Sequence, residues 1–333
     1  MRRFFTKKAI IIACIVSLVA LSGIALAKMW EKDIVITNGT ARISTTPKPQ
    51  LVKGSLSGVE CEQGTRRPVA VMLASDPEAR PLAGVGSADM VIEMPVTEGG
   101  VTRMMAIFQC NAPREIGSIR SARLDFLPLV QGFNALYVHW GGEHEVLALL
   151  DKHIVQNIDC IKLDGTTCQR KRGIPRPHNG YTTSQLIKEK VEALGYSTTK
   201  NLVEYLFDSA KSQGIVAVPT LYSGEFAVKW TYDPASNKYT RSRGGTAEID
   251  RLTGNPVQAS NVIVLHTTSE YVSILYNRVK TTGSGKATVY HNGEAITATW
   301  EKLTDNAKLA IKDAKGDEVE LTPGNTWWEF VTP

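Results

Sequence analysis

The sequence predicts an α+β protein in which an N-terminal mixed α/β domain precedes a mostly-β C-terminal domain, behind an N-terminal membrane-spanning or signal segment. Three observations support this prediction. A long apolar stretch follows a basic N-terminus, strand and helix patterns alternate over about residues 68–213, and helical patterns end near residue 215. With 333 residues, the chain is long enough for about two domains with cores of ordinary size.

Residues 1–27 have the features of a signal peptide or a single-pass membrane anchor. The sequence MRRFFTKK supplies four basic residues, and residues 9–27 are almost entirely apolar. This charge asymmetry predicts a cytoplasmic N-terminus and an extracytoplasmic bulk. The Ala-Leu-Ala sequence ending at Ala27 permits cleavage and secretion, whereas Trp30 fits the interfacial aromatic residue of an uncut anchor. We expect an uncleaved anchor in the cell membrane.

Residues 28–55 are predicted to form a linker, because they contain two prolines close together and no apolar periodicity. The mixed α/β domain is expected over 56–214 and the mostly-β domain over 215–333. Apolar runs bounded by turn residues predict strands in the first domain at 69–74, 90–96, 101–110 and 135–142. Helical spacing predicts helices at 118–133 with its start at Gly117–Ser118, 143–153, 182–196 and 202–214.

The second domain shows strand patterns separated by short turn sequences. A hairpin is expected over 226–242, where an Asp-Pro…Asn turn joins two strands. His-Asn-Gly-Glu and Ala-Lys-Gly-Asp supply further tight turns. The remaining strand patterns lie at 261–268, 271–277, 286–300 and 308–321.

Charge and cysteine content limit the class of protein. The net charge of +5 is spread along the chain without a basic stripe, so we expect no nucleic-acid partner. Four cysteines follow the apolar segment, and an even number in an exported chain permits two disulfides with three connectivities. A Cys160–Cys168 bond would close a short loop and leave Cys61 with Cys110. Four free thiols are the alternative.

Several familiar catalytic motifs are incomplete. Gly-Ser-Gly-Lys-Ala at 283–287 lacks the first glycine and the Ser/Thr of a phosphate loop. His-Glu-Val-Leu-Ala at 144–148 lacks the second histidine of a zinc-binding HExxH helix. A metal site built from His139, His144, His178 and Glu143 fits no standard spacing. We therefore expect no metal and no cofactor.

A set of polar residues lies at the predicted strand ends and loops of the first domain. Such positions hold ligands in α/β folds, and arginines there can make bidentate contacts with a carboxylate or phosphate. The candidate ligand-binding residues are Glu98, Arg103, Arg120, Arg123, His139, His178 and Asn179.

Each candidate also has a structural explanation. Arg120 and Arg123 could form salt bridges to Glu98 or Asp125 at a helix surface. His139 could be a buried histidine bonded to backbone, and His178–Asn179 could cap the following helix.

Seven motifs over residues 55–333 resemble those of the YerB-like proteins in order and spacing. They are RRPVAVMLASDPEARPLAGVGSADMVIE, TEGGVTRMMAIFQ, IGSIRSAR, YVHWGGE, PHNGYTT, GSGKATVYHNGEAITATW and LTPGNTWWEFV. The resemblance implies a two-domain envelope protein of Gram-positive-type bacteria, often a lipoprotein, with no agreed catalytic residues. This chain lacks a lipobox cysteine, since Cys14 lies inside the apolar stretch, so a peptide anchor is expected instead of a lipid.

The sequence favours a membrane-anchored extracytoplasmic binding or scaffold protein over an enzyme. Its first domain would hold an anionic envelope ligand between Arg103, Arg120, Arg123, His139 and His178. The alternative is a hydrolase acting on cell wall or glycan, with His139 or Glu143 as general base and the arginines stabilising negative charge. A third class is a structural module that binds a protein partner without a pocket.

Overall fold

The computed structural model describes residues 33–37, 40–44, 50–98, 100–199, 202–209 and 214–333. The chain divides into two units, Met1–Leu51 and Val52–Pro333. The predicted signal or anchor segment, residues 1–27, lies outside the described residues. Among the residues that are described, no helix is both long and apolar enough to cross a membrane.

The first unit contains an antiparallel strand pair, β1 (Asp33–Thr37) and β2 (Thr40–Ser44), inside the predicted linker. The sequence signal for it is the Asn-Gly dipeptide at 38–39 between two short runs with β-branched residues, a typical hairpin sequence. The prolines that suggested a linker come after this pair.

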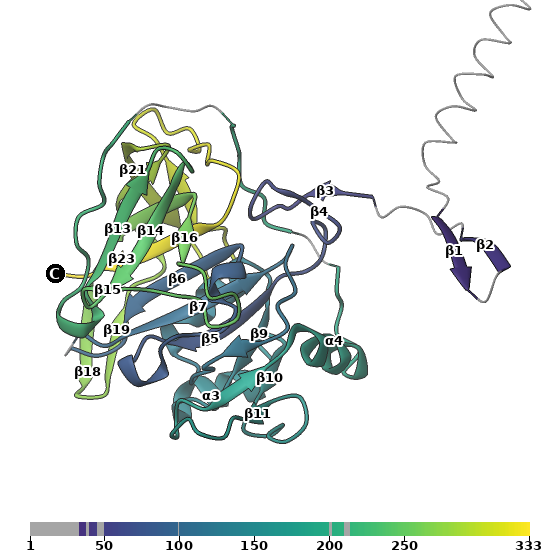
Figure 1. Cartoon of the computed structure of the whole chain (residues 1–333). Coiled ribbons are helices and arrows are strands. Elements are labelled where there is room, and N and C mark those ends of the chain that lie inside the picture. The colour runs from purple at the N-terminus through teal and green to yellow at the C-terminus, as the bar shows by residue number, and fades with distance from the viewer. Residues whose placement is uncertain (1–32, 38–39, 45–49, 99, 200–201, 210–213) are drawn as a thin grey trace, which may run out of the picture. The chain divides into compact units, whose positions relative to one another are not determined.

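The second unit is built on one mixed ten-stranded sheet (Figure 1). Its strands, in spatial order, are β10 (Asn157–Asp159), β9 (Leu136–His139), β5 (Val69–Ala74), β7 (Thr102–Phe108), β6 (Met90–Pro95), β23 (Thr326–Val331), β17 (Asn261–His266), β20 (Gly283–His291), β21 (Glu294–Lys302) and β22 (Ala310–Lys312). The first five belong to the first half of the chain and the last five to the second. The halves join where β6 pairs in parallel with β23, with Met90 opposite Thr326.

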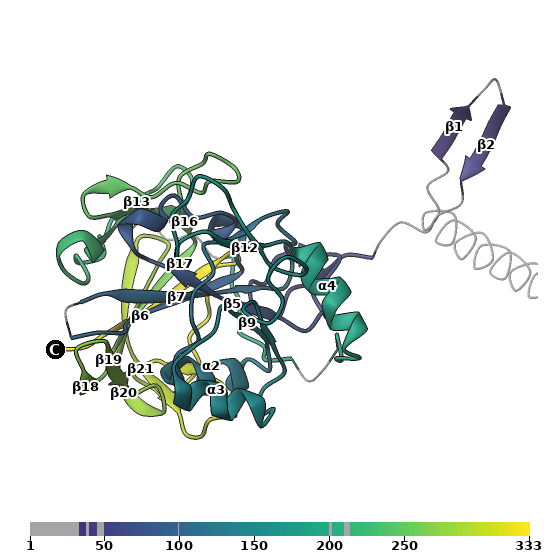
Figure 2. The same ribbon diagram turned by 90° about the horizontal axis from the view of Figure 1, so that it is seen from below.

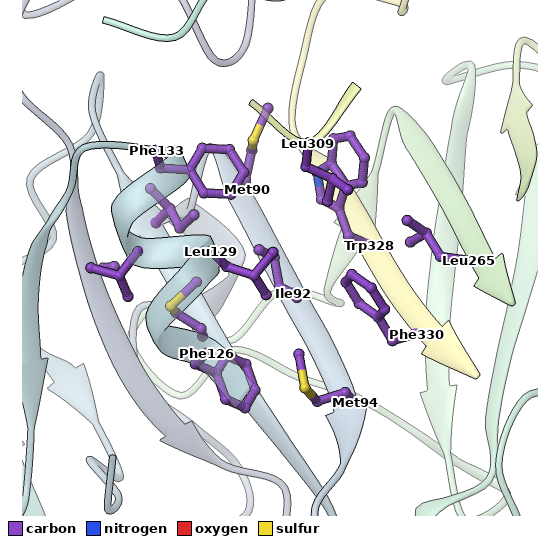
Figure 3. Close-up of a cluster of buried hydrophobic side chains, with 14 of the residues drawn as sticks. Met90, Ile92, Met94, Phe126, Leu129, Phe133, Leu265, Leu309, Trp328 and Phe330 are labelled. Carbon is purple, nitrogen blue, oxygen red and sulfur yellow. The ribbon is translucent and has the colours of Figure 1, made fainter. Parts of the chain in front are cut away.

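The two central strands, β6 and β23, are buried on both faces, as expected for strands covered from both sides. Helix α2 (Leu127–Gly132) covers one face, where its Leu129 and the flanking Phe126 and Phe133 pack against alternate residues of β6 and β23 (Figure 3). Those residues are Met90, Ile92, Met94, Trp328 and Phe330. The alternation places the remaining residues of both strands on the opposite face.

The opposite face is covered by a second, smaller sheet formed by β13 (Val228–Asp233), β14 (Lys238–Arg243), β15 (Thr246–Ala247) and β16 (Gln258–Ala259). Trp230 and Tyr239 of this sheet are fully buried and belong to the same apolar cluster as Trp327. Figure 2 shows β13 and β16 on one side of the central strands, with α2 and α3 (His144–Asp151) on the other.

The remaining elements are short, apart from α4 (Ser184–Ala193), whose first turn is capped by the Thr183 hydroxyl accepting from the Leu186 N–H at 3.0 Å. They are β3 (Val52–Lys53), β4 (Glu60–Cys61), β8 (Ile116–Gly117), β11 (Gln169–Arg170), β12 (Gly180–Thr182), β18 (Ser269–Ser273), β19 (Tyr276–Val279), η1 (Pro77–Ala79), η2 (Val85–Ser87), η3 (Leu124–Phe126) and η4 (Gly224–Phe226).

Three local predictions are wrong. The helix expected from Gly117–Ser118 begins only at Leu127, after β8 and the 3₁₀ turn η3. The described part of the helix expected at 202–214 is not helical, and Phe207 forms a bridge with Leu321 instead. The strand expected at 271–277 is a hairpin, β18–β19, that turns at its two central aliphatic residues. In the first two cases, pairing with distant segments overrides a local apolar pattern.

A buried ion network lies between the two sheets and joins the halves of the chain. Arg241 Nη1 lies 2.7 Å from Glu248 Oε2, and Arg241 Nη2 lies 3.3 Å from Glu329 Oε1. Arg243 Nη1 donates to Glu93 Oε1 at 2.7 Å. All five side chains are buried, so their charges are compensated by one another and not by water.

Both predicted disulfides form. Cys61 is bonded to Cys110, 49 residues away, and Cys160 is bonded to Cys168, eight residues away. The first bond ties β4 to the residues that follow β7. The second closes a loop after β10.

Replacing both Cys160 and Cys168 by alanine is expected to lower the free energy of unfolding by about 2.5 kcal/mol, because the open loop gains entropy in the unfolded chain. Urea unfolding monitored by tryptophan fluorescence would measure it. Lys162→Ala in the same loop is the matched control and should change stability by about 0–1 kcal/mol, since its pair with Asp151 is exposed. A double variant as stable as this control would contradict the prediction.

Candidate functional site

The segment 116–123 runs across the carboxyl ends of two parallel strands, β5 and β9. The Arg120 N–H donates to the Met72 carbonyl at 2.9 Å, and the Arg120 carbonyl accepts from the Trp140 N–H at 2.9 Å. The Ala122 N–H donates to the Gly141 carbonyl at 2.8 Å. Arg120 and Arg123 are therefore presented by an extended segment fixed to the sheet, and not by one face of a helix.

Asp76 and Arg103 lie at the same edge of the sheet. Asp76 follows the end of β5, and Arg103, near the start of β7, is opposite Ala74 of β5. Arg103 Nη1 lies 2.8 Å from Asp76 Oδ2, and Arg120 Nη2 lies 3.6 Å from the same oxygen. The Arg103 side chain is only 4% exposed, while that of Arg120 is 16% exposed. The cluster therefore reaches solvent at Arg120.

Arg123 completes a group of three guanidinium ions. It lies under the ring of Tyr276, with its Cζ 5.0 Å from the ring centre. Burial lowers the pKa of Arg123, and the neighbouring charge of Arg103 lowers it further. Burial likewise lowers the pKa of Arg120, which Asp76 partly offsets. The three like charges lie close enough to repel one another.

His178 lies at the edge of this group. Partial burial and the charge of Arg120 lower the pKa of its imidazole, whereas Asp76 raises it. The balance favours the neutral ring at neutral pH. We call Asp76, Arg103, Arg120, Arg123 and His178 the arginine cluster.

The arginine cluster holds buried polar atoms that have no hydrogen-bond partner among the described residues. They include the Nε atoms of all three arginines and Nδ1 of His178. Two further such atoms lie on the residues that frame the cluster, Oγ of Ser118 and Nε1 of Trp140. Buried polar groups without partners are costly. Three guanidinium ions with one carboxylate form a site suited to an anion.

His139 and Glu143 are used elsewhere. His139 is fully buried, with Nδ1 2.8 Å from the Gly141 carbonyl and Nε2 3.2 Å from Asn157 Oδ1. Burial lowers the pKa of its imidazole. Glu143 Oε1 accepts from the Leu124 N–H at 3.3 Å and lies 3.3 Å from Arg278 Nη1. His139 is therefore a buried structural residue, and the carboxylate of Glu143 is held in an ion pair with Arg278.

The side chains of Glu98 and Asn179 also make their contacts outside the arginine cluster. Glu98 is exposed beside the β6–β7 turn and lines a separate cavity of about 530 Å³. Asn179 Oδ1 accepts from Arg170 Nη1 at 3.0 Å. Neither His178 nor Asn179 caps α4, since that role belongs to Thr183.

Two members of this neighbourhood were not predicted. Asp76 takes the ion-pair role that was considered for Glu98 or Asp125; Asp125 instead accepts from the Val279 N–H at 3.1 Å. The position of Asp76 directly after the strand at 69–74 is the signal that could have identified it. Tyr276 comes from the second half of the chain, and its approach to Arg123 has no local sequence signal.

No group of three or more His, Cys, Asp or Glu side chains suited to a metal ion occurs in the part of the chain that the structure describes. The guanidinium ions of the arginine cluster can recognise an anion through charge and paired hydrogen bonds.

Comparisons with known proteins identify the family. Residues 56–197 match the model described as "Protein of unknown function (DUF3048) N-terminal domain", and residues 216–328 match the corresponding C-terminal domain. YerB of Bacillus subtilis (strain 168), named as a candidate lipoprotein, is 31% identical over 289 residues, covering 84% of this chain and 86% of the relative. The crystal structure of the YerB protein from Bacillus subtilis matches with a TM-score of 0.75 and 30% identity, over 84% of this chain and 96% of that one. The resemblance expected from the motifs is confirmed: the chain belongs to the YerB-like DUF3048 family.

Proposed function

We propose that this chain is a membrane-anchored extracytoplasmic binding protein of the cell envelope, and that its arginine cluster holds an anionic group of an envelope ligand. The location is supported by the basic and apolar N-terminal sequence and by the lipoprotein name of its Bacillus subtilis relative. The two disulfides suit an extracytoplasmic environment.

The observation that carries the binding proposal is the charge imbalance of the arginine cluster. Arg103 and Arg120 share one close carboxylate, that of Asp76, while Arg123 forms no ion pair among the described residues and its pKa is lowered by burial and by the charge of Arg103. A bound phosphate or carboxylate would reduce the repulsion between the guanidinium ions and supply acceptors to their N–H groups. The partly exposed Arg120 side chain provides the contact with solvent through which a ligand enters.

The hydrolase alternative has weaker support. A general base must reach the substrate, and His139 is fully buried while Glu143 is paired with Arg278. No histidine–carboxylate hydrogen bond of the kind expected for a general base links His139 or His178 to a described residue. We therefore favour the binding of an anionic ligand over hydrolysis.

A thermal-shift screen of the purified full chain tests this function. The compounds would be inorganic phosphate, teichoic-acid phosphates, nucleotides, sugar acids and muropeptides. A compound at a hundred times its Kd should add about 2.7 kcal/mol to the free energy of unfolding. Arg120→Ala should remove this gain, because it deletes a partly exposed cation of the cluster.

Arg172→Ala is the matched control, since Arg172 is an exposed arginine outside the cluster. This variant should keep the ligand-induced gain of the parent. A gain that survives Arg120→Ala would place the binding site elsewhere, and the absence of a gain with every compound would contradict the binding role.

A further inference from the structure

The β18–β19 hairpin ends in an exposed apolar tip, which we define as residues 271–276. Figures 1 and 2 show this hairpin at the periphery of the compact unit. The side chains at the tip are largely exposed, with relative exposures of 58% for Tyr271, 48% for Val272, 80% for Ile274 and 62% for Leu275. The sequence from 271 to 277 contains no charged residue. Contiguous exposed apolar surface of this kind marks an interaction site.

Exposed apolar side chains occupy the end of β18 and the turn that follows it. Tyr271 and Val272 are consecutive residues of β18, where the pairing has a bulge between Tyr271 and Ser273, and Ile274 and Leu275 form the turn. A lipid bilayer surrounds an inserted tip on all sides, so it can cover all four of these side chains.

The order of residue types within the tip corresponds to the headgroup and acyl-chain layers of a lipid bilayer. Tyr271 and Tyr276 flank the aliphatic pair Ile274 and Leu275. Tyrosine rings are enriched at the level of lipid headgroups, because they combine an apolar ring with a polar hydroxyl. The aliphatic pair between them would reach the acyl chains.

The base of the hairpin is fixed to the rest of the unit. The Val279 N–H donates to Asp125 Oδ2 at 3.1 Å, and the Thr281 hydroxyl donates to the Asp125 carbonyl at 3.0 Å. Arg278 Nη2 lies 2.9 Å from Glu145 Oε2. Beside them, Tyr276 covers Arg123. The tip therefore extends from a base that is fixed to the rest of the unit by hydrogen bonds and by the ion pairs of Arg278.

We propose that the tip of the β18–β19 hairpin inserts into the lipid bilayer in which the N-terminal segment is anchored. The chain between Ala27 and Val52 spans at most roughly 85 Å when fully extended, which keeps the compact unit within reach of that bilayer. A tethered unit needs only a weak second contact, because the tether gives it a high effective concentration at the membrane. The inference rests on the anchoring part of the proposed function and not on ligand binding by the arginine cluster.

Site-specific fluorescence of the full chain tests this inference. The chain would carry Cys14→Ser, to remove the free thiol of the N-terminal segment, and Leu275→Cys labelled with an environment-sensitive dye. It would be reconstituted into vesicles of 70% phosphatidylcholine and 30% phosphatidylglycerol that contain acyl-chain nitroxide lipids. Quenching of the dye at position 275 should exceed that at a Lys315→Cys control by roughly threefold, because the nitroxide quenches only at short range within the acyl region. Lys315 lies in an exposed turn of the second half of the chain.

Two further measurements keep the result decisive. Adding Ile274→Asp to the labelled chain should reduce quenching to the level of the control, since a carboxylate is costly among acyl chains. Quenching at 275 no stronger than at 315, or unaffected by Ile274→Asp, would overturn the proposal. Flotation of the same vesicles separates the two ideas: a chain that floats without quenching refutes only tip insertion, whereas a chain that does not float refutes the anchoring as well.

Discussion

Replacing Arg241 by alanine is expected to lower the free energy of unfolding by about 3–5 kcal/mol, because it leaves the buried Glu329 without its ion-pair partner and leaves Glu93 and Glu248 with Arg243 alone. The Arg241 guanidinium contacts Glu93, Glu248 and Glu329, all of them buried. It also lies 4.1 Å from the ring centre of Trp327, an additional cation–π contact. Water cannot replace these contacts without opening the space between the two sheets.

Urea unfolding at neutral pH would measure this effect, and Lys229→Ala is its matched control. Lys229 lies on β13, the strand paired with β14, and is exposed. The control should change the free energy of unfolding by less than about 0.5 kcal/mol. A loss for Arg241→Ala as small as that of the control would show that the network contributes little to holding the halves together.

Local patterns predict much of the first half of the central sheet. The strands at 69–74, 90–96 and 101–110 and the helix at 182–196 occur close to their expected positions. These segments carry their own signals: unbroken apolar runs bounded by turns, and for the helix a Thr cap with a glycine at its end. The hairpin at 226–242 is confirmed for the same reason.

The pairing that joins the halves could not be predicted in this way. β6 and β23 are separated by more than 200 residues, and no local pattern specifies which distant strand a buried strand will pair with. One signal was present nonetheless. Each of these apolar strands contains a single glutamate, Glu93 or Glu329, and a buried carboxylate requires a partner. Those partners, Arg241 and Arg243, lie on a third segment.

The arginine cluster was predicted by residue type and position, but its geometry was not. Arg103, Arg120, Arg123 and His178 are candidates in the sequence because they lie at predicted strand ends, loops or helix starts, and the structure brings them together. His139 met the same criterion and is buried instead, because a strand end can be covered by the chain that follows it. The position of a residue in the sequence therefore indicates that it lies at this edge of the sheet. Whether its side chain is exposed, and which residue it pairs with, depends on segments far away along the chain.

Replacing Glu329 by glutamine is expected to change the dependence of stability on pH. Burial, with the nearby carboxylate of Glu93 adding to it, raises the pKa of Glu329 to about 7, although Arg241 opposes this shift. Between about pH 4.5 and pH 7, this carboxyl group is therefore protonated in the folded chain. In the unfolded chain, where its pKa has the ordinary value of 4.5, it is ionised over the same range. The stability of the parent protein should therefore fall as pH rises from about 4.5 to about 7, and the glutamine variant should lack this decrease.

The free energy of unfolding of Glu329→Gln, relative to the parent, should rise by roughly 3 kcal/mol between pH 4.5 and pH 8. Urea unfolding at several pH values would measure the difference. Arg243 and Arg241 lower the pKa of Glu93 against the effect of burial. The stability that ionised Glu93 contributes is therefore lost only at more acidic pH, and it largely cancels when the variant is compared with the parent. Glu320→Gln, at an exposed position, is the matched control, and its free energy of unfolding should stay within about 0.5 kcal/mol of the parent. A constant difference for Glu329→Gln would mean that this carboxyl group remains ionised in the fold, because its contacts with Arg241 and Trp230 would then outweigh its burial.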